Sequence, residues 1–199
     1  MAGSPAGAFH RANALTYLSL LAGVLAIAAA LAERSGAAGA LIALAVIADT
    51  FDGRFARLFM RSPDERAVGV QLDSLSDAIA FGITPCICLA AAAPRSSDWM
   101  AVGWWITCFG FAACAITRLA FYNVTHESGS GFIGVPVPVA ALIASTVLLL
   151  APSAVFGALA LLACSAAMVL PLRIPRPTGY GLATFVLWPV ALVLLGVRS

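Results

Sequence analysis

The sequence predicts an all-α membrane protein, a polytopic transmembrane helix bundle with a six-helix core, a candidate seventh span and a cytoplasmic N-terminus. Of its 199 residues, 62% are hydrophobic and only 10% are charged, and the mean hydropathy is +1.00. This composition lies well outside that of a soluble globular domain. The apolar runs also match the ~20 residues needed to cross a hydrocarbon core of ~30 Å. The distribution of arginine predicts the orientation.

Seven apolar runs give the candidate spans, and polar or proline-containing turns separate them. They cover residues 15–32, 37–59, 69–92, 99–122, 133–150, 154–170 and, less regularly, 182–197. The first run is longer than the core of a signal peptide, so we expect a retained helix. The runs leave no room for a soluble domain, and we expect residues 1–199 to form one integral membrane domain.

All eleven basic residues are arginines, and cytoplasmic loops carry an excess of positive charge. With the N-terminus inside, eight arginines fall on the cytoplasmic side: Arg11, Arg54, Arg57, Arg61, Arg66, Arg118, Arg173 and Arg176. Only Arg34, Arg95 and Arg198 fall outside. We therefore expect a multi-pass protein of the inner (cytoplasmic) membrane. The net charge of +2 gives no reason to expect nucleic acid as a partner.

The cysteines and histidines do not predict a zinc site. The cysteines are odd in number, lack C-x2-C spacing and lie inside apolar runs: Cys86, Cys88, Cys108, Cys114 and Cys164. We expect them to be small apolar residues of the membrane interior. His10 and His126 fit no zinc spacing and are expected to be solvated.

Four aspartates are the exception in this apolar chain: Asp49, Asp52, Asp73 and Asp77. Ionisable groups at membrane depth persist only where they pair, face water or bind something. Separations of three and four residues place each pair on one helix face. Four carboxylates without a cation would repel one another, and hard oxygen ligands suit magnesium, manganese or calcium. The sequence thus predicts a site for one or two divalent ions at the cytoplasmic ends of the second and third spans.

These residues alone leave three interpretations open: metal-assisted phosphoryl chemistry, an ion-transport path, and a structural ionic network. Arg57 could neutralise the carboxylates or hold a phosphate beside the metal. Gly53, Ala56 and Gly69 lie near the acids and leave space for a ligand. A nucleotide cleft requires such space and a transport path does not.

The aspartates and their neighbours resemble the signature of the CDP-alcohol phosphatidyltransferase family. The signature is present here as Asp49-x2-Asp52-Gly53-x2-Ala56-Arg57 followed by Gly69-x3-Asp73-x3-Asp77, eight fixed positions in order. One departure is the spacer of eleven residues between Arg57 and Gly69, which is longer than is common in the family. Because this spacer is polar and contains Pro63, we expect the extra length to enlarge the cytoplasmic turn.

The resemblance implies a homodimer with a cytoplasm-facing cavity that holds two divalent ions, Mg²⁺ or Mn²⁺. Asp49, Asp52 and Asp73 would be metal ligands, and Asp77 would complete the metal site and act as the base that activates the attacking alcohol. The CDP moiety of CDP-diacylglycerol would be bordered by Asn13, Thr16, Gly53, Ala56, Arg57 and Gly69. Such an enzyme transfers a phosphatidyl group to a small alcohol and releases CMP.

Further segments are similar to the CDP-diacylglycerol–serine O-phosphatidyltransferase branch of this family. Asn13-x2-Thr16-x6-Gly23 looks like the family's first-helix pattern. Residues 72–85 (LDSLSDAIAFGITP) resemble a run of the serine branch, and residues 117–124 and 132–138 resemble two more of its segments. The glycerol-phosphate branch has a lysine pattern that is missing here, since the chain contains no lysine. L-serine is therefore the expected acceptor.

Phe121 replaces the second arginine of that branch, which leaves Arg118 as the expected contact for the acceptor or a phosphate. The alternative for Arg118 is a side chain that snorkels to the cytoplasm. Arg173 and Arg176 are expected to anchor the chain at the cytoplasmic surface or contact the phosphates of membrane lipids. Other acceptors that stay open are glycerol 3-phosphate, inositol phosphate and choline, and a cation-coupled transporter is a more remote alternative.

Overall fold

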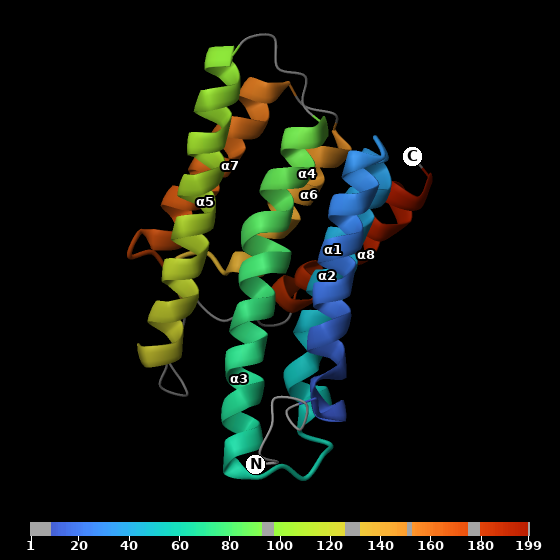
Figure 1. Cartoon of the computed structure of the whole chain (residues 1–199), viewed down its shortest axis with the longest axis vertical. Coiled ribbons are helices and arrows are strands. Elements are labelled where there is room, and N and C mark those ends of the chain that lie inside the picture. The colour runs from blue at the N-terminus through green and yellow to red at the C-terminus, as the bar shows by residue number, and fades with distance from the viewer. Residues whose placement is uncertain (1–8, 93–97, 126–131, 151–152, 175–179, 199) are drawn as a thin grey trace.

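The computed structural model describes residues 9–92, 98–125, 132–150, 153–174 and 180–198. They form a bundle of elongated helices (Figure 1). A short turn, η2 (Arg11–Asn13), leads into α1 (Ala14–Leu31), which packs against α2 (Ser35–Ala56). One continuous helix follows, made of α3 (Pro63–Asp77), the π-helical η3 (Ala78–Ile83) and α4 (Thr84–Ala92). The chain ends with α5 (Asp98–Thr125), α6 (Val137–Leu149), α7 (Ala154–Val169) and α8 (Tyr180–Arg198).

Among the described residues, four helical stretches are long and apolar enough to cross a membrane: Arg11–Leu31, Ser35–Ala56, Pro63–Ala92 and Asp98–Thr125. Three shorter helical stretches are also apolar: Val137–Leu149, Ala154–Val169 and Val186–Arg198. The predicted all-α membrane bundle is confirmed, and every predicted span coincides with a helix over most of its length. Four of the five cysteines are buried and Cys114 is half-buried, as expected for small apolar residues of the bundle interior.

The third helix begins six residues earlier than predicted, at Pro63. The Oγ atom of Ser62 accepts a hydrogen bond from the backbone N–H of Glu65 (3.3 Å), and the Glu65 carboxylate accepts one from the N–H of Ser62 (2.7 Å). This capping box, with proline at the first helical position, fixes the start of α3. The prediction that the long spacer enlarges the turn is wrong, because residues 63–68 form the first turns of the helix.

The fifth predicted span, residues 133–150, begins with a strand instead of a helix. β1 (Phe132–Ile133) pairs antiparallel with β2 (Arg173–Ile174), and the N–H of Gly134 donates to the carbonyl of Leu172 (2.8 Å). Gly134 has φ +71°, and a Cβ there would collide with the carbonyl of Met168. Because this backbone is left-handed, it favours glycine. The helix begins only at Val137, after Pro136.

Small residues allow the helices to approach closely, as is common in membrane bundles. A Cβ on Gly23 of α1 would lie 3.1 Å from the Cα of Ala80 in η3. A Cβ on Gly196 of α8 would collide with the carbonyl of Gly36 and lie 2.9 Å from the Cβ of Ala40 on α2. These glycines therefore account for how closely α1 approaches η3 and α8 approaches α2.

The π-helical η3 directly follows Asp77. Pro85 has no N–H to donate to the carbonyl of residue 81, and its ring would crowd that carbonyl in a regular helix. The hydroxyl of Thr84 donates instead to the carbonyl of Ile79, five residues earlier (3.0 Å). The wider π turn thus accommodates Pro85 while the helix continues from Pro63 to Ala92.

Candidate functional site

The structure brings the four aspartates together between α2 and α3. Carboxylate oxygens of Asp49, Asp52 and Asp73 all lie within 4.8 Å of one another. The carboxyl group of Asp77 lies beside that of Asp49, and the carboxyl group of Asp73 lies beside that of Asp52. The first three side chains are half-buried, whereas Asp77 is only 8% exposed. The predicted helix-face pairing therefore produces one cluster.

Side chains of α1 hold the cluster in place. The hydroxyl of Thr16 donates to Oδ2 of Asp52 (3.0 Å), and the hydroxyl of Ser76 on α3 donates to the carbonyl of Thr16 (3.1 Å). These bonds connect α1 with both aspartate-bearing helices. Thr16, a residue of the first-helix pattern, thus orients the carboxylate of Asp52.

The donor set fits a hard divalent cation. Oxygens that lie within 4.8 Å of one another can surround one ion at ~2.0–2.6 Å, the range for Mg²⁺ and Ca²⁺. Oδ1 of Asp73 is buried and has no hydrogen-bond partner, and a buried carboxylate oxygen without a donor is costly. Asp49, Asp52 and Asp73 are therefore the residues that could hold the metal.

A cleft of about 190 Å³ opens beside the cluster. Five of the six residues predicted to border CDP line it: Asn13, Thr16, Gly53, Ala56 and Gly69. A Cβ on Gly53 would meet nothing within 4 Å, so open space lies beside this glycine. The sixth residue, Arg57, does not line this cleft; it is exposed at the C-cap of α2.

Arg61 and Arg66 line the cleft together with Asp52 and Asp73. The distribution of arginine in the sequence predicts only that both lie on the cytoplasmic side of the membrane. The signal that could have located them is the Ser62-x2-Glu65 capping box, which lies between them and predicts a helix start.

Arg118 lies elsewhere, in a cavity of about 400 Å³ lined also by Thr117, Phe121, Ile133 and Met168. Its guanidinium carbon is 4.5 Å from the centre of the Tyr122 ring. The side chain is only 8% exposed, and its Nε and Nη2 atoms have no hydrogen-bond partner. This burial argues against the snorkelling alternative, and the two orphan donors indicate an anion-binding capacity.

The two histidines and the last two cytoplasmic arginines are the other residues for which the sequence makes a prediction. His10 is half-buried and its Nδ1 accepts a hydrogen bond from the N–H of Ala12 (3.0 Å), so the prediction that it is solvated is wrong. His126, Arg176 and the side chain of Arg173 lie outside the described residues.

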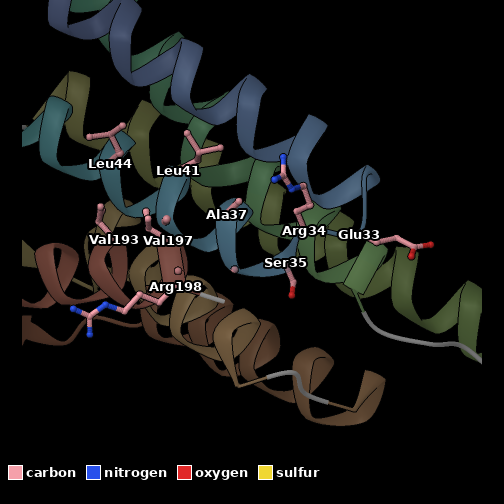
Figure 2. A pocket seen from close by; sticks show the side chains of 12 residues that line it. Glu33, Arg34, Ser35, Ala37, Leu41, Leu44, Val193, Val197 and Arg198 are labelled. Carbon is pink, nitrogen blue, oxygen red and sulfur yellow. The ribbon is translucent and has the colours of Figure 1, made fainter.

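A larger groove of about 650 Å³ lies at the α1–α2 connection and the end of α8. Figure 2 shows its apolar side chains from α2 and α8, with Arg34 and Arg198 at its margins. In Figure 1 this end of the bundle is at the top and the α2–α3 turn at the bottom. The groove contains none of the aspartates, so it is separate from the candidate site.

Comparisons with known proteins agree with the geometry. A CDP-diacylglycerol–serine O-phosphatidyltransferase of Mycobacterium tuberculosis is 39% identical over 152 residues, which cover 73% of this chain and 50% of that protein. An archaetidylserine synthase of Methanothermobacter thermautotrophicus is 34% identical over 171 residues, 85% of this chain and 71% of that protein. A CDP-diacylglycerol–serine O-phosphatidyltransferase of Helicobacter pylori is 30% identical over 139 residues, 66% of this chain and 54% of that protein.

The chain thus spans about half the length of the mycobacterial relative. The family model described as CDP-alcohol phosphatidyltransferase matches residues 9–172. This match includes α1, both aspartate pairs and the cleft between them. The chain therefore belongs to the CDP-alcohol phosphatidyltransferase family.

Proposed function

We propose that the protein transfers the phosphatidyl group of CDP-diacylglycerol to the hydroxyl of L-serine, giving phosphatidylserine and CMP. The observation that carries this proposal is the convergence of four aspartates beside a cleft lined by small residues of the family signature. The names of the relatives and the serine-like segments of the sequence support serine as the acceptor. We place the reaction in the cytoplasmic membrane, with the cleft open to the cytoplasm, because most arginines lie at that end.

In this proposal Asp49, Asp52 and Asp73 hold a divalent metal, Mg²⁺ or Mn²⁺, and a second ion is held with the help of Asp77. When bound, such ions neutralise the diphosphate and stabilise the charge that develops in the displacement. Thr16 keeps Asp52 oriented through its hydrogen bond. Gly53, Ala56 and Gly69 leave room for the nucleotide, and Asn13 provides an amide beside it. Arg57, outside the cleft, would meet the nucleotide only at its rim.

Asp77 is the proposed base. It has the least exposed surface of the four aspartates and lies beside Asp49. It accepts the proton of the serine hydroxyl, whose oxygen forms a bond to the phosphorus that carries diacylglycerol. The bond from that phosphorus to the bridging oxygen breaks, and CMP leaves with the electron pair. The proton of the alcohol thus ends on Asp77, and the electron pair of the broken bond ends on CMP, so the step balances in protons and charge.

Arg118 is proposed to contact the acceptor or a phosphate through its two unpartnered nitrogen atoms. Its cavity shares no lining residue with the aspartate cleft. This contact and the homodimer are predictions from the family resemblance, and the single-domain organisation is a prediction from the apolar runs.

The test is CMP release by purified protein supplied with CDP-diacylglycerol and a panel of alcohols. We expect release with L-serine in the presence of Mg²⁺ or Mn²⁺, and none after chelation with EDTA. Release with glycerol 3-phosphate, inositol phosphate or choline, but not with serine, would assign the protein to a sister branch. Cation flux in proteoliposomes without CMP release would instead favour a transporter.

A further inference from the structure

We propose that Arg61 and Arg66 bind the phosphate of the cytidylate half of CDP-diacylglycerol, the phosphate that leaves as part of CMP. The inference rests on the proposed function and adds two binding residues that lie outside the aspartate signature. Both arginines line the same cleft as Asp52 and Asp73. They approach it from the polar end of α3, whereas the aspartates lie deeper in the bundle.

Arg61 reaches the cleft across the bare backbone of Gly69. A Cβ at Gly69 would lie 3.0 Å from Nη1 of Arg61 and 3.2 Å from Oδ1 of Asn13. The guanidinium therefore occupies the space that a larger residue at position 69 would take. Gly69 itself is buried, and Arg61 is half-buried. The glycine of the signature thus serves to admit a cationic side chain as well as the nucleotide.

Arg66 lies on the same helical face as the metal-binding carboxylate of α3. Residues 66, 69, 70 and 73 all line the cleft, a spacing that places them on one stripe of the helix. With a rise of ~1.5 Å per residue, Arg66 precedes Asp73 by about 10 Å along the axis. A long arginine side chain and a phosphate beside the aspartates can together span that separation.

The capping box holds the two arginines in place. Arg61 directly precedes the N-cap Ser62, and the N–H of Arg66 donates to the carbonyl of Ser62 (3.1 Å). Ser62 and Glu65, which lie between the two arginines in the sequence, form the two reciprocal hydrogen bonds of the box. Because the backbone on both sides of the turn is fixed, less conformational entropy is lost when the guanidinium groups bind an anion.

The charges in the cleft favour a phosphate over an internal ion pair. The structure records no ion pair between either arginine and the four aspartates, all of which lie in its described part. Divalent ions held by the carboxylates would satisfy them, which would leave the guanidinium groups for the substrate. When the bond to the bridging oxygen breaks, negative charge grows on the cytidylate phosphate. Two arginines beside it would bind that charge more strongly as the reaction proceeds.

The experiment measures the affinity of the purified protein for CDP, CMP and cytidine in the presence of Mg²⁺. Arg61→Gln and Arg66→Gln should each weaken CDP binding by ~10- to 100-fold, the usual effect of losing a charged hydrogen bond, and should leave cytidine binding unchanged. The matched control is Arg54→Gln, since Arg54 is exposed in the last turn of α2 and does not line the cleft. Its affinity for all three ligands should match that of the unsubstituted protein.

The outcomes separate this inference from the proposed function. If the unsubstituted protein fails to bind CDP, the proposed function itself is wrong. If it binds CDP and the Arg61 and Arg66 variants bind it equally well, the inference is overturned. Parallel loss of CDP and cytidine binding would also overturn it, because the arginines would then hold the base or the fold instead of the phosphate. Thermal unfolding of each variant shows whether it remains folded.

Discussion

Asp77 differs from the other three aspartates in burial and in its neighbours. It is buried and contacts Asp49, whereas the group of three close carboxylate oxygens comes from the other residues. Asp77→Asn keeps the size of the side chain but removes its capacity to accept a proton. We expect CMP release to fall by ~10²- to 10⁴-fold, the usual contribution of a general base, with CDP binding largely kept. Turnover assays and equilibrium binding of CDP measure the two effects.

The control for this variant is Asp98→Asn, at the exposed start of α5. Neither turnover nor CDP binding should change there. Near-normal turnover in the Asp77 variant would remove Asp77 from the role of base and leave it as a metal ligand at most.

Thr16 offers a second test of the cluster. Its hydroxyl donates to Oδ2 of Asp52, and bonds that orient a metal ligand typically contribute 10- to 100-fold in metal affinity. Thr16→Val should therefore raise the Mg²⁺ concentration needed for half-maximal CMP release by about 10-fold. Thr107→Val is the matched control, because the Thr107 hydroxyl donates to the carbonyl of Gly103 within α5 (2.9 Å). An equal Mg²⁺ requirement in both variants would show that Thr16 does not orient the ligand.

The capping box of α3 links helix stability to the cleft. Ser62→Ala removes the acceptor for the N–H of Glu65, and loss of such a cap costs about 1 kcal/mol. We expect a lower unfolding temperature together with weaker CDP binding, because Arg61 and Arg66 lose their fixed turn. Ser153 caps α7 in the same way, accepting from the N–H of Phe156 (3.3 Å). Ser153→Ala should lower the unfolding temperature alone, and equal loss of CDP binding in both variants would contradict the link.

The helices were predictable because the thickness of the hydrocarbon core sets the length of a membrane span, and an apolar run of that length is visible in the sequence. Two elements were mispredicted because hydropathy does not report what forms them: a polar capping box at the start of α3, and a distant strand partner for β1. The start of α3 is charged, so it looked like a turn, although Ser62 and Glu65 hold a helix there. The strand β1 depends on a partner that lies about forty residues later in the chain, at Arg173–Ile174. Its tertiary pairing leaves no periodic signal in the apolar run of residues 133–150.

Much of the site was also predictable, because charge in an apolar chain is rare and its spacing is informative. The pairing of Asp49 with Asp52 and of Asp73 with Asp77 on helix faces predicted a cluster, and the structure brings all four together. The depth of the cleft was not predictable from spacing. It depends on how far α3 extends below the aspartates, which in turn decides that Arg61 and Arg66, and not Arg57, line it.

The orientation of the whole bundle is open to a direct test. Ala32 lies at the α1–α2 connection and Met60 in the α2–α3 turn, at opposite ends of α2, and both are exposed, Met60 by 98%. The arginine distribution places Met60 in the cytoplasm and Ala32 outside. A membrane-impermeant thiol reagent on intact cells should therefore label Ala32→Cys, and it should label Met60→Cys only after the membrane is opened. The natural cysteines, buried or half-buried, provide the low-labelling background. The reverse pattern would place the aspartate cleft on the outer side, where cytosolic substrates could not reach it.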